Sequence, residues 1–205
     1  MLERENLIQY CLNEIFKKMR SDCTDINDIS NKLRMVGFIS DSTQKDVSDL
    51  IYKIRDAIQK NISELGIGVK IRIGGSFKST PIWKIFNDEL SNLQNYLDRG
   101  CVNQMLQIAE LSEDVMLCVS HCPDAEKIAV PQELVFKDAN YELSGGITYI
   151  SDSLDSLRGY YISYVKEEGM WFEINDSARY LVTAEEVGEN LTQNGCLLRY
   201  TKIKR

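Results

Sequence analysis

The sequence predicts an α+β fold in which a helical N-terminal half packs on an antiparallel C-terminal β-sheet. Apolar residues recur at helical spacing through residues 6–20 and again through residues 43–65. From about residue 67, short stretches rich in aromatic and β-branched residues replace that spacing. The change of pattern predicts one domain of residues 1–205, with a helical part at 1–66 and a sheet-rich part at 67–205.

The helical part contains two amphipathic segments. Residues 6–20 carry an apolar stripe on one helix face. The second segment has Thr43 as its predicted N-cap, Asp46 in its first turn, and Gly66 at its end. Its apolar stripe consists of Val47, Leu50, Ile51, Ile54, Ala57, Ile58 and Ile62.

The sheet-rich part begins with alternation of apolar and basic residues over 69–73, which predicts a strand that ends at Gly74-Gly75. Residues 84–98 return to helical spacing and predict a helix. Further strands are predicted at 115–119, 141–150, 160–165, 170–174 and 196–201, with a hairpin turn at 167–169 and a short helical turn at 184–187.

Charge and histidine content exclude several classes of function. The chain has 24 Lys+Arg against 31 Asp+Glu and a net charge of −7, which does not suit a general nucleic-acid binder. The single histidine, His121, excludes any site that needs two, such as an HExxH zinc site. The six cysteines form no CxxC pair. We therefore expect neither a metal nor another cofactor.

The N-terminal residues lack the basic and apolar regions of a signal peptide. No apolar run approaches the roughly 18 residues that a membrane span needs. Sparse, scattered cysteines are typical of reduced thiols. These features predict an intracellular protein, cytoplasmic or nuclear, that has no membrane partner.

A series of short motifs runs through the sheet-rich part. In order, they are Val130–Leu134, Tyr141-Glu142-Leu143, Gly146–Tyr149, Gly159–Val165, Met170–Ser177, Glu185-Glu186-Val187 and Cys196–Tyr200. This series resembles the C-terminal boxes of the ubiquitin-specific proteases (USPs), and Gln44-Lys45-Asp46 is similar to the Gln-Gln-Asp box of that family. The resemblance implies a papain-like cysteine-protease fold, with a thumb-like part at 1–66 and a palm-like part at 67–205. The zinc-binding fingers of the family would be absent, because Cys101 is the single cysteine between Gly66 and Val115.

The USP family cleaves ubiquitin conjugates with a Cys-His-Asp/Asn triad, in which the imidazole activates the thiol. Its histidine stands in a Gly-His-Tyr run, and the matching run here is Gly159-Tyr160-Tyr161. Tyr160 therefore occupies the histidine position, where a phenol keeps its proton at neutral pH. The third triad position corresponds to Asn175, which is an allowed residue type.

The nucleophile position is also changed. The family's helix begins Cys-Tyr-x-Asn-Ser, whereas this chain reads Tyr10-Cys11-Leu12-Asn13-Glu14. Alignment on Asn13 places Tyr10 at the nucleophile position, and a shift of one residue would place Cys11 there. One residue is about 100° of helix rotation, which turns Cys11 toward the apolar stripe. His121 follows the predicted strand 115–119, where the family has no catalytic base.

These replacements predict a catalytically inactive USP-like protein, a pseudoenzyme that acts as a protein-interaction module. Its predicted partner-binding residues are Tyr160, Tyr161, Trp171 and Asp46, with core packing as the alternative role of Trp171. Ubiquitin or a ubiquitin-like protein is the first predicted partner, because the acidic surface of this chain would complement the basic face of ubiquitin.

Two other interpretations remain open. In the first, the chain is a structural or regulatory scaffold subunit of a large assembly such as the spliceosome, the proteasome or a ribosome, and it does not bind ubiquitin. In that case nucleic acid would be touched only through assembly contacts of residues 202–205 or of Lys70 and Arg72. Alternatively, the chain is an active thiol hydrolase that uses Cys11.

Overall fold

The computed structural model describes residues 10, 31, 34–35, 49, 51–53, 68–73, 75–86, 92–99, 101–103, 106–120, 127–151, 159–176 and 178–204. The chain divides into two compact units, Met1–Lys60 and Asn61–Arg205. Tyr10, Asp49 and residues 51–53 are helical, while most of the two predicted N-terminal helices lies outside the described residues. The sheets described below belong to the second unit.

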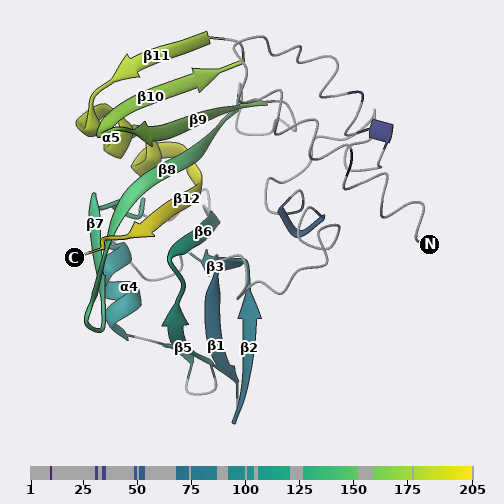
Figure 1. Ribbon diagram of the computed structural model, residues 1–205, viewed down its shortest axis with the longest axis vertical. Coiled ribbons are helices and arrows are strands. Elements are labelled where there is room, and N and C mark those ends of the chain that lie inside the picture. Colours follow the sequence, from purple (N-terminus) through teal and green to yellow (C-terminus); the bar gives the residue numbers. More distant parts are fainter. Residues whose placement is uncertain are drawn as a thin grey trace. The chain divides into compact units, whose positions relative to one another are not determined.

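The larger sheet of the second unit has eight strands (Figure 1). They are β3 (Ile82–Phe86), β6 (Asp114–Ser120), β7 (Glu133–Phe136), β8 (Ala139–Ser151), β9 (Gly159–Glu167), β10 (Met170–Asn175), β11 (Ala178–Val182) and β12 (Gly195–Lys202). The strand order is β11-β10-β9-β8-β12-β6-β3. The eighth strand, β7, is not part of this order and pairs with β8. β3 pairs with β6 in parallel, and the other pairings of this sheet are antiparallel. β12 thus lies between β8 and β6, in the interior of the sheet.

The smaller sheet has four strands in the order β2-β1-β5-β4. They are β1 (Val69–Ile73), β2 (Ser76–Thr80), β4 (Cys101–Asn103) and β5 (Leu106–Leu111). Val69 and Ile71 are buried, whereas Lys70 and Arg72 face solvent, as the alternation in the sequence predicts. The Tyr141 hydroxyl of β8 donates a hydrogen bond of 3.1 Å to the Leu111 carbonyl of β5, which connects the two sheets.

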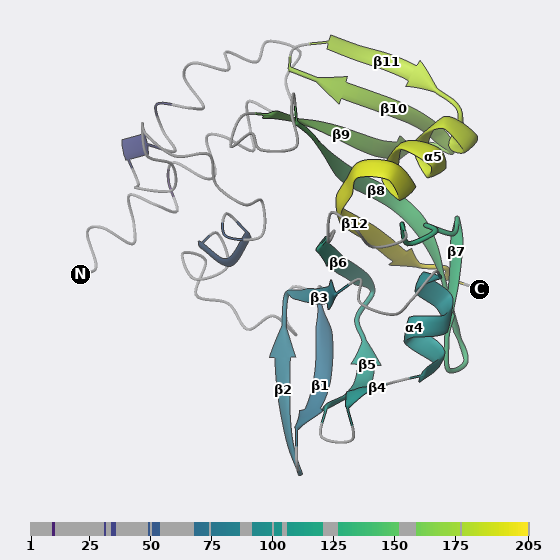
Figure 2. The ribbon, with the colours of Figure 1, turned by 180° about the vertical axis from the view of Figure 1, so that it is seen from behind.

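Two helices of the second unit are described, α4 (Leu93–Arg99) and α5 (Ala184–Asn194). α5 begins with a capping box: Glu186 N donates to Thr183 Oγ1 at 3.2 Å, and Thr183 N donates to Glu186 Oε2 at 2.8 Å. Its buried residues, Val187 and Leu191, hold it against the larger sheet, and Figure 2 shows α5 across β8 and β9. A Cβ at Gly146 of β8 would lie 2.5 Å from Leu191 Cδ2. The glycine therefore permits the close contact between helix and strand.

The predicted fold class, a helical N-terminal half packed on an antiparallel sheet, is wrong. In the described part of the chain strand far exceeds helix, and strands begin at Val69, well inside the N-terminal half. The sheet is also mixed, because β3 and β6 are parallel. The predicted helix at 84–98 is largely replaced by β3 and the shorter α4. A short apolar run in a buried strand fits helical spacing equally well, and Ile85 of β3 is fully buried.

Other local predictions are confirmed. Strands occupy the predicted segments 69–73, 115–119, 141–150, 160–165, 170–174 and 196–201. Glu168 and Gly169, at the centre of the predicted hairpin turn, have φ values of 50° and 81°, as a tight turn between twisted strands requires. The predicted helical turn at 184–187 is the start of the longer helix α5.

Candidate functional site

The Gly159-Tyr160-Tyr161 run opens strand β9, beside β8. Its residues pair with Ser151, Ile150 and Tyr149, respectively. A Cβ at Gly159 would lie 2.4 Å from the Ile150 carbonyl oxygen and 2.6 Å from Cζ and Oη of Tyr149. No larger residue fits there without movement of the β8 backbone. The glycine therefore fixes the start of β9 and the place of Tyr160.

The strand register places Tyr160 and Asn175 on the same face of the sheet. Ser163 of β9 pairs with Ile174 of β10, so the next residue, Asn175, shares a face with Ile162. Because side chains alternate along a strand, Tyr160 and Ile162 also share that face. Two of the three predicted triad positions are thus on adjacent strands of one unit, with a phenol in place of the imidazole and an amide where the family has Asp or Asn.

The remaining predicted site residues belong to other parts of the chain. Tyr10 lies in the unit Met1–Lys60 and is 62% exposed. Cys11, Asp46 and His121 lie outside the described residues. The pairing of Cys11 with a base, and the contribution of Asp46 to binding, therefore stay predictions.

Tyr160 and Tyr161 point to opposite faces of β9, and both are accessible. Tyr160 is 47% exposed and Tyr161 is 36% exposed. The Tyr161 ring packs on the Tyr149 ring, with centroids 5.0 Å apart and planes at 46°. Such tilted pairs hold aromatic rings in place. Tyr161 therefore presents an amphipathic surface that its contact with Tyr149 holds in place, and Tyr160 presents an accessible ring on the other face.

Beyond Tyr161, the same face continues across β10 to the edge strand β11. Val165 pairs with Phe172, and Phe172 pairs with Leu181, so these side chains share the face of Tyr161. Leu181 is 69% exposed. We call this surface, made of Tyr149, Tyr161, Phe172 and Leu181, the tyrosine face.

An arginine covers part of the tyrosine face. The Arg179 guanidinium lies 3.7 Å from the Phe172 ring centroid. Its Nη2 donates to Glu167 Oε2 at 2.6 Å. The face is therefore apolar at its centre and carries an oppositely charged pair at its rim, as protein-binding surfaces often do.

Trp171, the other predicted partner-binding residue of this sheet, is buried in the core. It is 3% exposed, and its register partners are Lys166 and Val182. This position supports the packing alternative for Trp171. Nearby Tyr164 is 4% exposed, and its hydroxyl donates to Glu173 Oε2 at 3.1 Å.

Burial, together with the negative charge of Glu173 and the hydrogen bond to it, raises the pKa of Tyr164 to about 12. Tyr164 therefore keeps its proton at neutral pH and serves as a donor inside the sheet–helix layer.

Sequence reasoning missed the exposed side chains of β11 and of the start of β10. Tyr180 and Leu181 are 55% and 69% exposed, and Met170 is 49% exposed. The available signal was the run Ala178–Val182, which is rich in residues that favour strands and lies between two turn-forming residues. The run extends the accessible apolar surface from β9 to the edge of the sheet.

Within the described residues, no group of three or more His, Cys, Asp or Glu side chains could hold a metal ion. The Cys196 Sγ donates to the Ile147 carbonyl at 3.2 Å. In the same part of the chain, no helix is both long and apolar enough to cross a bilayer. The accessible side chains of β9–β11 are mainly aromatic and aliphatic, with the Arg179–Glu167 pair at the rim.

No protein-family model matches the sequence, and no curated protein matches it. Solved structures do share the fold. A form of the SAGA DUB module of Ubp8, Sgf11, Sus1 and Sgf73 matches with a TM-score of 0.72 and 17% identity, over 96% of this chain and 58% of that chain. An essential yeast splicing factor matches with a TM-score of 0.68 and 10% identity, over 87% and 54% of the two chains. A SAGA DUB module bound to monoubiquitin matches with a TM-score of 0.66 and 17% identity, over 87% and 53%.

The chain spans a little more than half the length of these solved chains. At identities this low, the likeness shows the fold alone. That fold is USP-like, as the motifs in the sequence predict.

Proposed function

We propose that this chain is a catalytically inactive USP-like protein that acts as a protein-interaction module, with ubiquitin or a ubiquitin-like protein as its first partner. The observation that carries the proposal is the presence of Tyr160 where the family has its catalytic histidine. Tyr160 is 47% exposed, and a phenol does not replace imidazole as a base at neutral pH.

Binding is supported by the accessible side chains of β9. Tyr160 and Tyr161 are held by their strand and, for Tyr161, by the ring of Tyr149. Tyrosine is enriched among the residues that dominate binding energy at interfaces. A SAGA DUB module of the same fold is bound to monoubiquitin, which makes ubiquitin the natural first test. Asp46 is proposed as a further contact from the motif resemblance.

Titration of the chain with labelled monoubiquitin tests the binding proposal. Tyr160→Ala and Tyr161→Ala are each expected to weaken binding by about tenfold or more, because interface tyrosines often act as hot spots. Phe77→Ala is the control, since Phe77 is 60% exposed but lies on β2 of the smaller sheet. Equal losses in all three variants, or no binding of the parent protein, would contradict the proposal.

A ubiquitin probe with a thiol-reactive electrophile tests inactivity. No covalent adduct is expected, since no imidazole is proposed to activate a thiol. An adduct that disappears in Cys11→Ala but persists in Cys196→Ala would instead establish an active thiol hydrolase that uses Cys11.

A second candidate function is a scaffold subunit of a large assembly. It is favoured by the likeness to an essential yeast splicing factor. Native extract fractionated by size and probed for this chain distinguishes the two functions. Comigration with a large complex, without ubiquitin binding in the titration, would favour the scaffold. A small free species that binds ubiquitin would favour the first proposal.

A further inference from the structure

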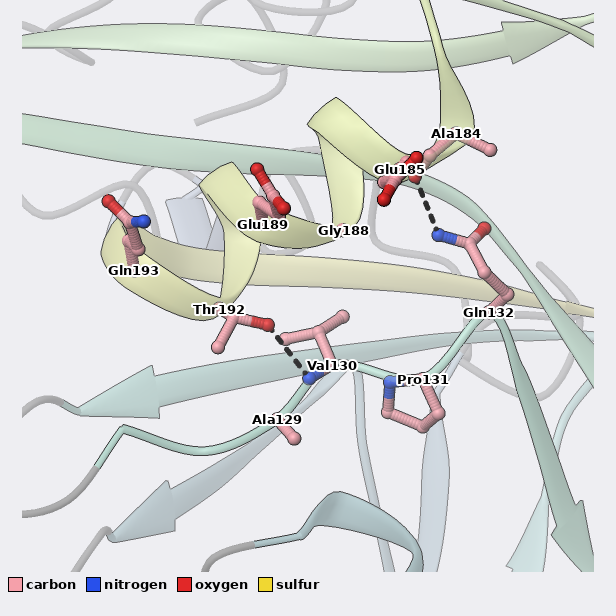
Figure 3. A pocket seen from close by; sticks show the side chains of 10 residues that line it. All are labelled: Ala129, Val130, Pro131, Gln132, Ala184, Glu185, Gly188, Glu189, Thr192 and Gln193. Atoms are coloured by element: carbon pink, nitrogen blue, oxygen red, sulfur yellow. Dashed lines mark hydrogen bonds between the residues drawn. The ribbon is translucent and has the colours of Figure 1, made fainter.

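A groove of about 710 Å³ runs between α5 and the extended segment 129–132 (Figure 3). It lies on the side of α5 that carries Gly188 and Thr192, whereas Val187 and Leu191 pack into the core. Its volume is in the range of ligand-binding clefts, roughly 300–1,000 Å³. The residues proposed above for ubiquitin binding do not line it.

Two hydrogen bonds hold the walls of the groove at a fixed spacing. The Val130 N–H donates to Thr192 Oγ1 at 3.1 Å, and Gln132 Nε2 donates to the Ala184 carbonyl at 3.0 Å. Figure 3 shows these bonds toward the two ends of α5, with Gly188 between them. Because Gly188 has no side chain, the middle of the groove stays open. The groove is therefore a built feature of the fold.

The backbone of the segment 130–132 is already engaged. Besides the Val130 N–H, the Pro131 carbonyl accepts from the Tyr200 hydroxyl at 2.8 Å, and the Gln132 carbonyl accepts from the Leu143 N–H at 2.8 Å. Proline has no N–H to donate. With these groups engaged, the segment does not offer the regular series of donors and acceptors that a further strand needs, so we expect a ligand to enter the groove through its side chains.

The lining selects the chemistry of those side chains. The floor is apolar, with Val130 and Pro131 opposite Ala184 and Gly188. Glu185 and Glu189 stand at the rim, four residues apart and so on the same helix face. Both are exposed, and within the described part of the chain neither forms an ion pair. An apolar floor under two available carboxylates complements an aliphatic group flanked by cations.

We propose that this groove docks a segment of a partner protein in which aliphatic side chains are flanked by lysine or arginine. The aliphatic side chains fill the space beside Gly188, and the cations pair with Glu185 and Glu189. The proposal is independent of ubiquitin binding and of catalysis.

Fluorescence anisotropy with three labelled peptides tests the proposal. The first carries leucines flanked by lysines, the second has glutamates in place of the lysines, and the third has serines in place of the leucines. The first peptide is expected to bind at least about tenfold more tightly than either of the others. Added salt should weaken its binding, because the ion pairs lie at the surface. Equal binding of all three would overturn the proposal.

Variants then locate the binding. Gly188→Leu fills the groove and is expected to weaken the first peptide by about tenfold or more. The new Cβ lies 3.2 Å from Gln132 Nε2, the far end of a flexible side chain, so the helix is expected to stay folded. The double variant Glu185→Gln/Glu189→Gln tests the rim without any added bulk and should weaken binding several-fold. Glu168→Gln, in the turn between β9 and β10, is the matched control and should leave binding unchanged.

Undiminished binding to both Gly188→Leu and the double variant would overturn the proposal. So would a concentration-dependent dimer of the parent protein that Gly188→Leu abolishes, since a second copy would then be the occupant. A thermal melt of each variant shows that a loss of binding is not a loss of folding.

Discussion

The Tyr164 hydroxyl donates a hydrogen bond of 3.1 Å to Glu173 Oε2, between neighbouring strands β9 and β10. This bond lies on the face of the sheet that α5 covers, which explains why both the burial of Tyr164 and the charge of Glu173 oppose loss of the phenolic proton. Tyr141, which is bonded to the Leu111 carbonyl, has a pKa that burial first and the charges of Glu113 and Glu110 second raise to about 12.

These two tyrosines predict a loss of stability in alkaline solution. Tyrosine in an unfolded chain loses its proton near pH 10, so above that pH the unfolded state binds fewer protons than the folded state. The free energy of unfolding should therefore fall as pH rises from about 10 to about 12, and the contribution should be complete below pH 10. Urea unfolding at a series of pH values measures it.

Tyr164→Phe should reduce the alkaline fall in the free energy of unfolding, because phenylalanine has no phenolic proton that the folded state could retain above pH 10. Tyr180→Phe, at an exposed site of β11, should leave the fall as in the parent protein. An identical pH profile for the parent and Tyr164→Phe would contradict the link between this bond and the raised pKa.

Gly159→Ala is expected to destabilise the protein more than Gly146→Ala. At Gly159 the new Cβ would lie 2.4 Å from the Ile150 carbonyl oxygen, which is backbone and cannot rotate away. At Gly146 its closest contacts would be the terminal methyl groups of Leu191, and the nearest backbone atom, the Leu197 carbonyl oxygen, would be 3.2 Å away. Overpacking in a core costs about 1–3 kcal/mol, so we expect the upper end or more at Gly159. Denaturant unfolding of both variants checks the order, and a smaller loss at Gly159 would contradict the contact geometry.

Thr183→Ala should destabilise the protein by about 1 kcal/mol, because α5 loses the side chain that caps its first turn. Thr183→Ser keeps the hydroxyl and should recover most of the loss. The same box lowers the pKa of Glu186, chiefly through the Thr183 N–H and then its hydroxyl. The contribution of Glu186 should therefore be present above pH 4.3 or so and be lost as pH falls further. Thermal melts at neutral and acidic pH test both statements.

Arg179→Ala is expected to cost no more than about 1 kcal/mol, although Arg179 both stacks on Phe172 and pairs with Glu167. Both charged side chains are about half exposed, so water competes for the pair. Arg179→Lys should recover only part of the loss, because an ammonium group does not stack flat on a ring. Glu167→Gln separates the two contacts, since it weakens the ion pair and leaves the stacking. Chemical unfolding of the three variants measures the difference.

The strands that the sequence predicts well are those in the middle of the larger sheet. β8, β9, β10 and β12 combine aromatic and β-branched residues with clear turns, so local pattern and tertiary burial agree. The predicted helix at 84–98 failed because Ile82–Phe86 is an apolar run whose spacing does not distinguish a buried strand from a helix. Only its pairing with β6, which lies far along the chain, decides the outcome.

The candidate site likewise has features that the sequence predicts and features that only the tertiary structure reveals. The start of β9 at Gly159 and the exposure of Tyr160 could be predicted from a motif and its strand pattern. The shared face of Tyr160 and Asn175 depends on the register between β9 and β10, and a shift of one residue would separate them. The α5 groove depends on how the segment 129–132 crosses the helix, which no local pattern carries.

The interior position of β12 sets the order in which the fold can be completed. β12 is the last described strand along the chain, yet it joins β8 on one side to β6 on the other. Until residues 195–202 have left the ribosome, β12 cannot pair, so the edges of β8 and β6 that face it in the finished sheet stay unpaired. Unpaired strand edges favour aggregation, so the newly made chain is expected to depend most on chaperones during this interval.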